Sequence, residues 1–210
     1  MLKAMKSFAP QFILGVFCFG VVLTAAPARA DDAAEIYVQD ILDEAEPILD
    51  RATEDEIFEG VAELVEKYVD MRRISRFVLG QYARQITDEQ KEEYTPLFRK
   101  YATQVYQNTL SNYAGQKLEV VQSVDRSDRD IIVNTKIVDP EPGDGFANTV
   151  FHWRVYRNRE GEMSVVDAGA DNVWLAIEQR SQFTSVIANN GGSEKGIDAL
   201  IAQLREQVGE

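Results

Sequence analysis

The residues of this chain that could do chemistry are basic side chains clustered in one short stretch. Between positions 67 and 84 the chain carries one acid, Asp70, and five bases, Lys67, Arg72, Arg73, Arg76 and Arg84. A guanidinium presents a planar fork of N–H donors that matches the oxygens of a phosphate or a carboxylate. The cluster therefore fits a site for a phosphate group or for an acidic partner surface. Its simplest interpretation is a solvated helix face that balances the acidic residues 31–60. A second, looser basic group consists of Arg154, Arg157, Arg159 and Arg180.

Other reactive residue types are scarce. The only cysteine is Cys18 and the only histidine is His152. Residues 31–210 therefore cannot form a disulfide, a cysteine-ligated metal site, a two-histidine metal site or a histidine relay. We expect His152 to be a packed strand residue, and we nominate no catalytic residue, no metal and no cofactor. The formal net charge of −13 argues against nucleic acid as a partner and against adsorption to anionic lipid surfaces.

The first thirty residues have the pattern of a secretory signal peptide. Lys3 and Lys6 precede an apolar run over 8–23, and Ala28-Arg29-Ala30 forms an A-x-A cleavage site. An uncleaved membrane anchor is the alternative. We expect cleavage after Ala30, export, and a mature chain of residues 31–210 that contains no cysteine.

The stretch 31–115 has helical patterning. We expect a first helix from 33 that Pro47 bends or ends, a second over 54–68, and a short third that Asp70 caps. The capping-box pattern Thr87-Asp88-Glu89-Gln90 predicts the start of a long helix that Gly115 could terminate. Pro96 should kink or split that helix because it has no backbone N–H.

After position 115 the apolar period becomes two, which predicts strands. We expect them at 117–126, 130–138, 146–157 and 162–168, followed by helices at 178–190 and 194–207. Short turns between the strands favour an antiparallel meander. The order predicts an α+β fold with a four-stranded twisted antiparallel sheet packed against several helices. We treat 31–210 as one domain with a helical part (31–115 and 178–210) and a sheet part (117–177).

Large aromatic residues are frequent in both parts. They could fill an ordinary core or line an apolar cavity between sheet and helices, and composition does not separate these alternatives.

Several short runs have the order and spacing of one known family. They are Phe77-Val78-Leu79-Gly80-Gln81-Tyr82, Ile86-Thr87-Asp88-Glu89-Gln90, Tyr113-Ala114-Gly115, Val165-Val166-Asp167, Arg180-Ser181-Gln182-Phe183 and Leu200-Ile201-Ala202-Gln203-Leu204-Arg205. Over about 70–207 the chain resembles the MlaC family, the periplasmic phospholipid-binding proteins of the Ttg2/toluene-tolerance group. It departs from the family pattern at Met163, where Trp is usual, at Asn172, where Gly is usual, and at Glu178-Gln179, where Asn-Tyr is usual.

The resemblance implies a periplasmic phospholipid carrier, not an enzyme. Such carriers shuttle lipid between an outer-membrane lipoprotein complex and an inner-membrane ABC lipid transporter with its substrate-binding ring protein, which maintains outer-membrane lipid asymmetry. It also implies an apolar cavity for the acyl chains. We expect this cavity to be lined by Leu79, Tyr82, Phe98, Tyr101, Val105, Ile131, Val133, Ile137, Phe151, Trp153, Val155, Val165, Val173, Leu175 and Phe183. Arg72, Arg73 and Arg76 would contact the headgroup or a partner. The alternatives are a small-molecule enzyme on a curved-sheet cone and a periplasmic interaction module with a filled core.

Overall fold

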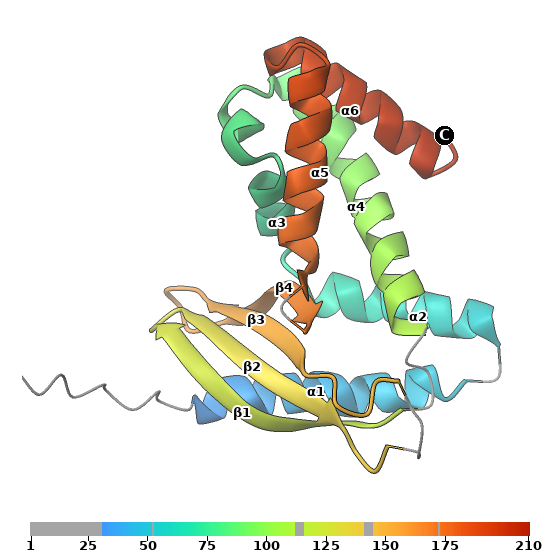
Figure 1. Cartoon of the computed structure of the whole chain (residues 1–210), viewed down its shortest axis with the longest axis vertical. Helices are drawn as coiled ribbons and strands as arrows, with labels where there is room; N and C mark the ends of the chain where they lie inside the picture. The colour runs from blue at the N-terminus through green and yellow to red at the C-terminus, as the bar shows by residue number, and fades with distance from the viewer. Residues whose placement is uncertain (1–30, 52, 112–115, 141–144, 172) are drawn as a thin grey trace, which may run out of the picture.

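A computed structural model describes residues 31–51, 53–111, 116–140, 145–171 and 173–210. The predicted signal peptide with its A-x-A motif and Gly115 lie outside these ranges. Figure 1 shows a twisted sheet with helix α1 along one face, and a body of helices α3 to α6 that rises from the β4 end of the sheet. The predicted α+β fold is confirmed.

The first three helices begin at side chains that the sequence marks as caps. In α1 (Asp32–Leu49), an oxygen of Asp31 accepts a hydrogen bond from the Ala34 N–H at 2.9 Å. Thr53 caps α2 (Glu54–Tyr68), and Asp70 caps α3 (Met71–Val78) by accepting from the Arg73 N–H at 2.9 Å. These oxygens satisfy N–H groups that have no partner within the first turn. The predicted cap at Asp70 is confirmed.

A short 3-10 helix, η1 (Gly80–Arg84), leads to the long helix α4 (Asp88–Ser111). Thr87 and Gln90 form the predicted capping box, each side chain accepting from the other's backbone N–H at 3.2 Å. Pro96 does not split α4, contrary to one of the expected outcomes. Pro96 and Glu92 are both exposed, so water can take up the Glu92 carbonyl that proline leaves without a donor.

The sheet is an antiparallel meander in the order β1-β2-β3-β4-β5. Its strands are β1 (Leu118–Ser127), β2 (Asp130–Ile137), β3 (Phe151–Arg157), β4 (Met163–Ala170) and β5 (Val173–Trp174). The sequence predicted four strands, and the fifth is a two-residue strand that pairs with β4 and runs directly into α5 (Leu175–Asn189). Helix α5 therefore begins three residues earlier than position 178. Strand β3 begins at 151 rather than 146, because the Thr149 N–H donates to the Phe146 carbonyl in a turn. Helix α6 (Ser193–Gln207) closes the chain.

Buried apolar residues form two separate clusters. The helical core lies among α2 to α6, while the sheet core consists of Ala34, Val38, Ile131, Val133 and Val155. On β2 the odd-numbered residues from 131 to 137 are buried and Lys136 is exposed, as the alternation predicted. The buried face of β2 packs against α1, so the sheet core is separate from the helical body.

Two hydrogen bonds join the sheet to the helical body at β4. The Asp70 N–H donates to the Val165 carbonyl at 2.9 Å. The Ala176 N–H, in the first turn of α5, donates to the Asp167 carboxylate at 2.9 Å. Asp167 thereby caps α5, because the side chain of the N-cap residue Trp174 makes no capping hydrogen bond. One bond comes from the N-cap of α3 and the other from the first turn of α5. Together they hold the N-terminal ends of both helices against β4.

Candidate functional site

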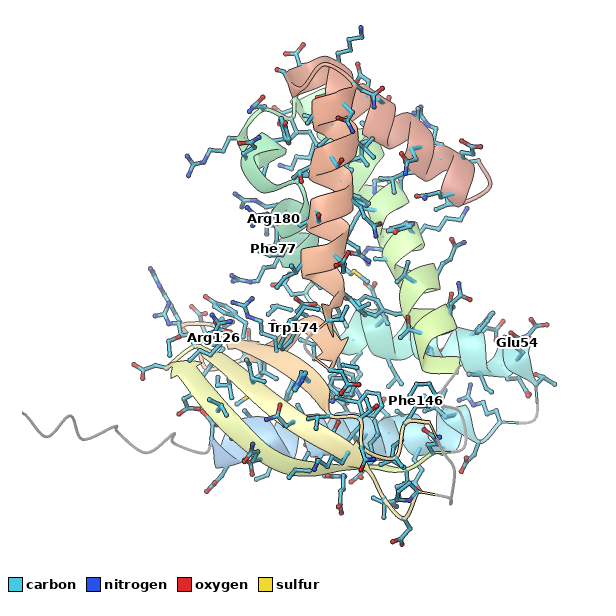
Figure 2. The ribbon with its side chains drawn as sticks, in the orientation of Figure 1. Glu54, Phe77, Arg126, Phe146, Trp174 and Arg180 are labelled. Carbon is cyan, nitrogen blue, oxygen red and sulfur yellow. The ribbon has the colours of Figure 1, made fainter. Side chains whose placement is uncertain are left out.

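A sizeable hollow lies where α3 and η1 meet α5. Its volume is about 770 Å³. We call it the arginine groove, and its lining residues are Asp70, Arg72, Arg73, Arg76, Phe77, Gly80, Gln81, Ala83, Arg84 and Arg180. Figure 2 shows Phe77 and Arg180 next to each other on this side of the helical body.

Helix α3 places its arginines in the groove by simple amphipathic spacing. Met71, Ile74, Ser75 and Val78 are buried against the helical core, and the arginines between them at 72, 73 and 76 are exposed. The basic cluster is thus the solvated face of a helix, and the same face forms one wall of a hollow.

Gly80 brings a further arginine to that wall from a distant part of the chain. Its φ of +56° lies in the left-handed region that favours glycine. A Cβ at this position would lie 2.9 Å from the Thr184 methyl group and 3.2 Å from the Arg180 Nε. The close approach of η1 to α5 therefore depends on glycine, and it sets Arg180 beside the α3 arginines.

Most of the groove's positive charge is not neutralised within the chain. Arg73 forms an ion pair with Asp70 at 3.3 Å, and its guanidinium stacks 3.6 Å from the centre of the Tyr156 ring. Among the described residues, no carboxylate lies within 4.0 Å of the charged groups of Arg72, Arg76, Arg84 or Arg180. Four guanidinium groups therefore remain free to bind an anion.

We call the half-buried lining residues Phe77 and Ala83 the floor of the groove, and this floor is apolar. Phe77 and Ala83 are half-buried and pack against the helical core, and the Arg180 guanidinium lies 4.9 Å from the centre of the Phe77 ring. The floor thus connects a cationic rim to the apolar interior of the helical body. This arrangement fits a ligand that has both an anionic part and an apolar part.

Lys67, which the sequence grouped with these arginines, does not join them. Its ammonium group binds Glu44 of α1 at 2.6 Å. Arg180, which the sequence assigned to the looser second group, is a member of the groove, as are Phe77, Gln81 and Ala83. Phe77, Gln81 and Arg180 lie in two family-like runs, 77–82 and 180–183, and Ala83 directly follows the first of them; the fold brings the two runs together.

Two of the three remaining members of the second basic group, Arg154 and Arg157, hold the sheet together instead, and Arg159 is exposed. Arg154 donates two hydrogen bonds to Asp130, at 2.8 and 2.9 Å, and these bonds lower the pKa of Asp130. Arg157 donates to both oxygens of Asp31, at 2.8 and 2.7 Å. Burial alone would raise the pKa of Asp31, but its hydrogen bonds from Arg157 and from backbone N–H groups bring it below its ordinary value.

The fifteen residues expected to line a cavity are divided between several places. Members buried in the helical core or half-buried against it are Leu79, Tyr82, Phe98, Tyr101, Leu175 and Phe183. Members in the sheet core or packed against it are Ile131, Val133, Trp153 and Val155. The others are Ile137, Phe151 and Val165, which are buried, Val105, which is half-buried on α4, and Val173, which is 55% exposed. None of the fifteen lines the arginine groove, whereas Arg72, Arg73 and Arg76 all do.

His152 is a packed strand residue, as expected. Its Nδ1 lies 2.7 Å from the Asn134 side-chain oxygen, and its ring stacks on Trp174 with 5.5 Å between centroids. Burial lowers the pKa of His152, so the ring is neutral at pH 7. These contacts give it a structural role.

Asp167 is the buried acid that a carboxylate enzyme would require. Burial raises its pKa to about 6. One of its oxygens accepts from the backbone N–H groups of Ala168 and Ala176, and the other has no hydrogen-bond partner. Asp167 is not among the residues that line the arginine groove, and its bonds identify it as the cap of α5.

The described residues contain no group of three or more histidine, cysteine or acidic side chains that could hold a metal ion. Within those same ranges, no helix has both the length and the apolar character needed to cross a membrane.

Comparison with known proteins gives consistent matches. The family model described as MlaC protein matches residues 37–206. A relative from Haemophilus influenzae, the intermembrane phospholipid transport system binding protein MlaC, is 25% identical over 146 residues, which are 68% of this chain and 64% of that protein. The match therefore spans a little less than two thirds of the relative's length.

A solved structure has the same fold. It is the phospholipid-binding protein from Ralstonia solanacearum in complex with a phospholipid, with a TM-score of 0.65 at 22% identity, covering 87% of this chain and 98% of that one. Because the family model covers most of the sequence, the conclusion is direct: the chain belongs to the MlaC family.

Proposed function

We propose that this protein is a periplasmic carrier of diacyl phospholipid. The observation that carries the proposal is the family match over residues 37–206. The fold shared with a protein solved in complex with a phospholipid supports it. The proposal does not include enzymatic activity, because Asp167, the buried acid with a raised pKa among the described residues, caps a helix.

A carrier of this kind solves a clear physical problem. Two acyl chains contain about thirty methylene groups, and each costs about 0.8 kcal/mol to expose to water. Spontaneous movement of such a lipid through an aqueous compartment is therefore negligible. A protein that shields the tails and leaves the headgroup near solvent is sufficient to make the transfer.

For the tails, we propose the helical core rather than the sheet core. The expected lining residues Leu79, Tyr82, Phe98, Tyr101, Leu175 and Phe183 belong to it or pack against it. Phe77 and Ala83 connect this core to the arginine groove, so tails that enter beneath Phe77 would leave the headgroup in the groove. The sheet core is covered by α1, and none of its five buried residues lines the groove.

The proposed cycle begins with export directed by residues 1–30. The mature carrier then receives lipid from, or delivers it to, an outer-membrane lipoprotein complex and an inner-membrane ABC lipid transporter with its substrate-binding ring protein. A role in outer-membrane lipid asymmetry follows from such a cycle.

The decisive experiment is to extract the protein, purified from a bacterial periplasm, with organic solvent and to analyse the extract by mass spectrometry. We expect diacyl phospholipid in near-stoichiometric amounts. The purified protein should also move labelled phospholipid between donor and acceptor vesicles. Protein that contains no lipid and takes up none from vesicles would contradict the proposal, and a filled-core interaction module would then be the better description.

A further inference from the structure

We propose that the arginine groove binds the phosphate of an anionic phospholipid headgroup and so makes the carrier select its cargo by headgroup charge. The inference rests on the proposed carrier function and deepens it. It assigns a ligand to the groove residues Arg72, Arg76, Arg84 and Arg180. It also gives the carrier a preference for phosphatidylglycerol-like over phosphatidylethanolamine-like lipids.

The first argument is the contrast between these charges and the rest of the chain. The protein has 35 acidic residues against 22 Lys and Arg, so carboxylates are available nearly everywhere on its surface. Arg99 pairs with Glu66 and Arg205 with Glu93, although both arginines are well exposed. Four unpaired arginines in one hollow therefore repel one another without compensation within the described residues, and a bound anion would remove that repulsion.

The second argument is shape. The hollow of about 770 Å³ lies within the usual size range of small-molecule sites. Guanidinium groups converge on it from α3, η1 and α5, and each can donate two parallel hydrogen bonds to a phosphate. The single acid, Asp70, is already bound to Arg73 and to a backbone N–H, so it offers little to an ammonium headgroup.

The third argument is the floor. Phe77 and Ala83 place apolar surface directly under the charges and lead into the helical core. A phospholipid has the same sequence of parts, an anionic phosphate followed by apolar chains. The acidic surface of a protein would meet the arginines at the rim but would leave this apolar floor unused, so the lipid is the better match.

The test compares the wild type with two triple variants. The groove variant carries Arg72→Gln, Arg76→Gln and Arg84→Gln, whose side chains make no ion pair within the described residues. The control variant carries Arg129→Gln, Arg159→Gln and Lys195→Gln, which are exposed and lie outside the groove. Both variants remove three positive charges, so they separate the effect of the groove from that of net charge.

Each protein is incubated with vesicles that contain equal amounts of phosphatidylglycerol and phosphatidylethanolamine, re-isolated, and analysed for bound lipid. We expect the wild type and the control to carry several-fold more phosphatidylglycerol than phosphatidylethanolamine. The groove variant should carry the two lipids in nearly equal amounts, because its phosphatidylglycerol content falls. A parallel titration with inorganic phosphate distinguishes the sources, because a site for the headgroup should bind the free ion only weakly.

An equal lipid ratio in all three proteins would overturn the inference while leaving the carrier function intact. So would tight binding of inorganic phosphate together with an unchanged lipid ratio. A groove variant that keeps the ratio but no longer binds its transporter partners would assign the groove to protein docking instead. Absence of lipid from all three proteins would overturn the carrier function and this inference with it.

Discussion

The arginines of the sheet and the arginines of the groove have the same chemistry but opposite surroundings. On the sheet, Arg154 and Arg157 each bind both oxygens of one half-buried carboxylate. In the groove, Arg72, Arg76 and Arg84 have no carboxylate within ion-pair distance among the described residues. The comparison teaches that, in a chain rich in acids, an unpaired arginine is more informative about function than a paired one.

The paired arginines contribute to the fold because they connect distant elements. The bond between Arg157 and Asp31 joins β3 to the first turn of α1, across 126 positions of sequence. Arg154 joins β3 to β2 through Asp130, and its charge offsets a part of the rise that burial causes in the pKa of Asp167. Substitutions and pH changes that act on the paired residues of the sheet should therefore change stability far more than those that act on the unpaired arginines of the groove.

The largest expected effect concerns pH and Asp167, in the sheet region. Its pKa is raised by burial to about 6 in the folded protein, against 3.8 for the ordinary group. The folded state therefore binds more protons than the unfolded state between these values, and the contribution of Asp167 to stability is greatest at low pH and is lost as pH rises through 6. At about 1.4 kcal/mol per pH unit, the change is on the order of 3 kcal/mol.

Urea unfolding at a series of pH values from 4 to 7.5 measures this effect. The variant Asp167→Asn should show a much flatter profile over that range, because asparagine cannot titrate. The groove variant should keep the wild-type profile, since its arginines stay charged throughout. A wild-type stability that rises steadily from pH 4 to 7 would contradict the assignment.

The next largest effect is expected at Asp31, which both caps α1 and binds Arg157. Asp31→Ala removes the cap, which contributes about 1 kcal/mol, and takes the carboxylate partner from the half-buried Arg157 guanidinium, which keeps only its hydrogen bond to the Asp128 carbonyl, for a total loss of about 2 to 3 kcal/mol. Asp31→Asn keeps a capping oxygen and loses only the charge, so it should destabilise the mature protein by about half as much. Chemical unfolding of the three proteins at pH 7 gives the comparison, and equal stability of Ala and Asn variants would show that the cap contributes nothing.

Local patterns predicted the local structure well. The caps at Asp70 and Thr87 and the buried alternation on β2 all follow from rules that act over a few residues. Of the two outcomes expected at Pro96, a kink or a split, the split does not occur, and the exposure of Pro96 and Glu92 makes the missing hydrogen bond inexpensive. The two-residue strand β5 was missed because so short a segment has no periodicity.

Which element covers which face is a long-range property, and there the sequence was less informative. Alternation correctly identified Val133 as an inward residue, but it carries no information that the covering element is α1 rather than the helical body. Likewise, nothing local to Arg180 shows that it lies beside residues one hundred positions earlier. Both relationships depend on packing. The position of Arg180 depends on the contact between Gly80 and α5.

That contact provides a way to break the groove without removing a charge. Gly80→Ala forces a Cβ into the left-handed region and against Thr184 and Arg180, which should destabilise the protein by about 1 to 2 kcal/mol. Because η1 must move away from α5, Arg180 should separate from the other arginines and the preference for anionic lipid should weaken. Gly145→Ala, whose added Cβ would meet no atom within 4 Å and which lies outside the groove, is a matched control. A Gly80→Ala protein with wild-type stability and wild-type lipid preference would show that the close approach is not required.

The smallest expected effect on stability belongs to the groove arginines themselves. Arg72→Gln, Arg76→Gln and Arg84→Gln remove no ion pair within the described residues and relieve repulsion between like charges, so the free energy of unfolding should stay within about 0.5 kcal/mol of the wild type. The measurement must use lipid-free protein, because bound cargo stabilises the folded state in proportion to its affinity. Once lipid is added, wild type should gain more stability from phosphatidylglycerol than the groove variant does, while both gain equally from phosphatidylethanolamine. A loss of more than about 1 kcal/mol in the lipid-free variant would mean that these arginines hold the fold together after all, as their counterparts on the sheet do.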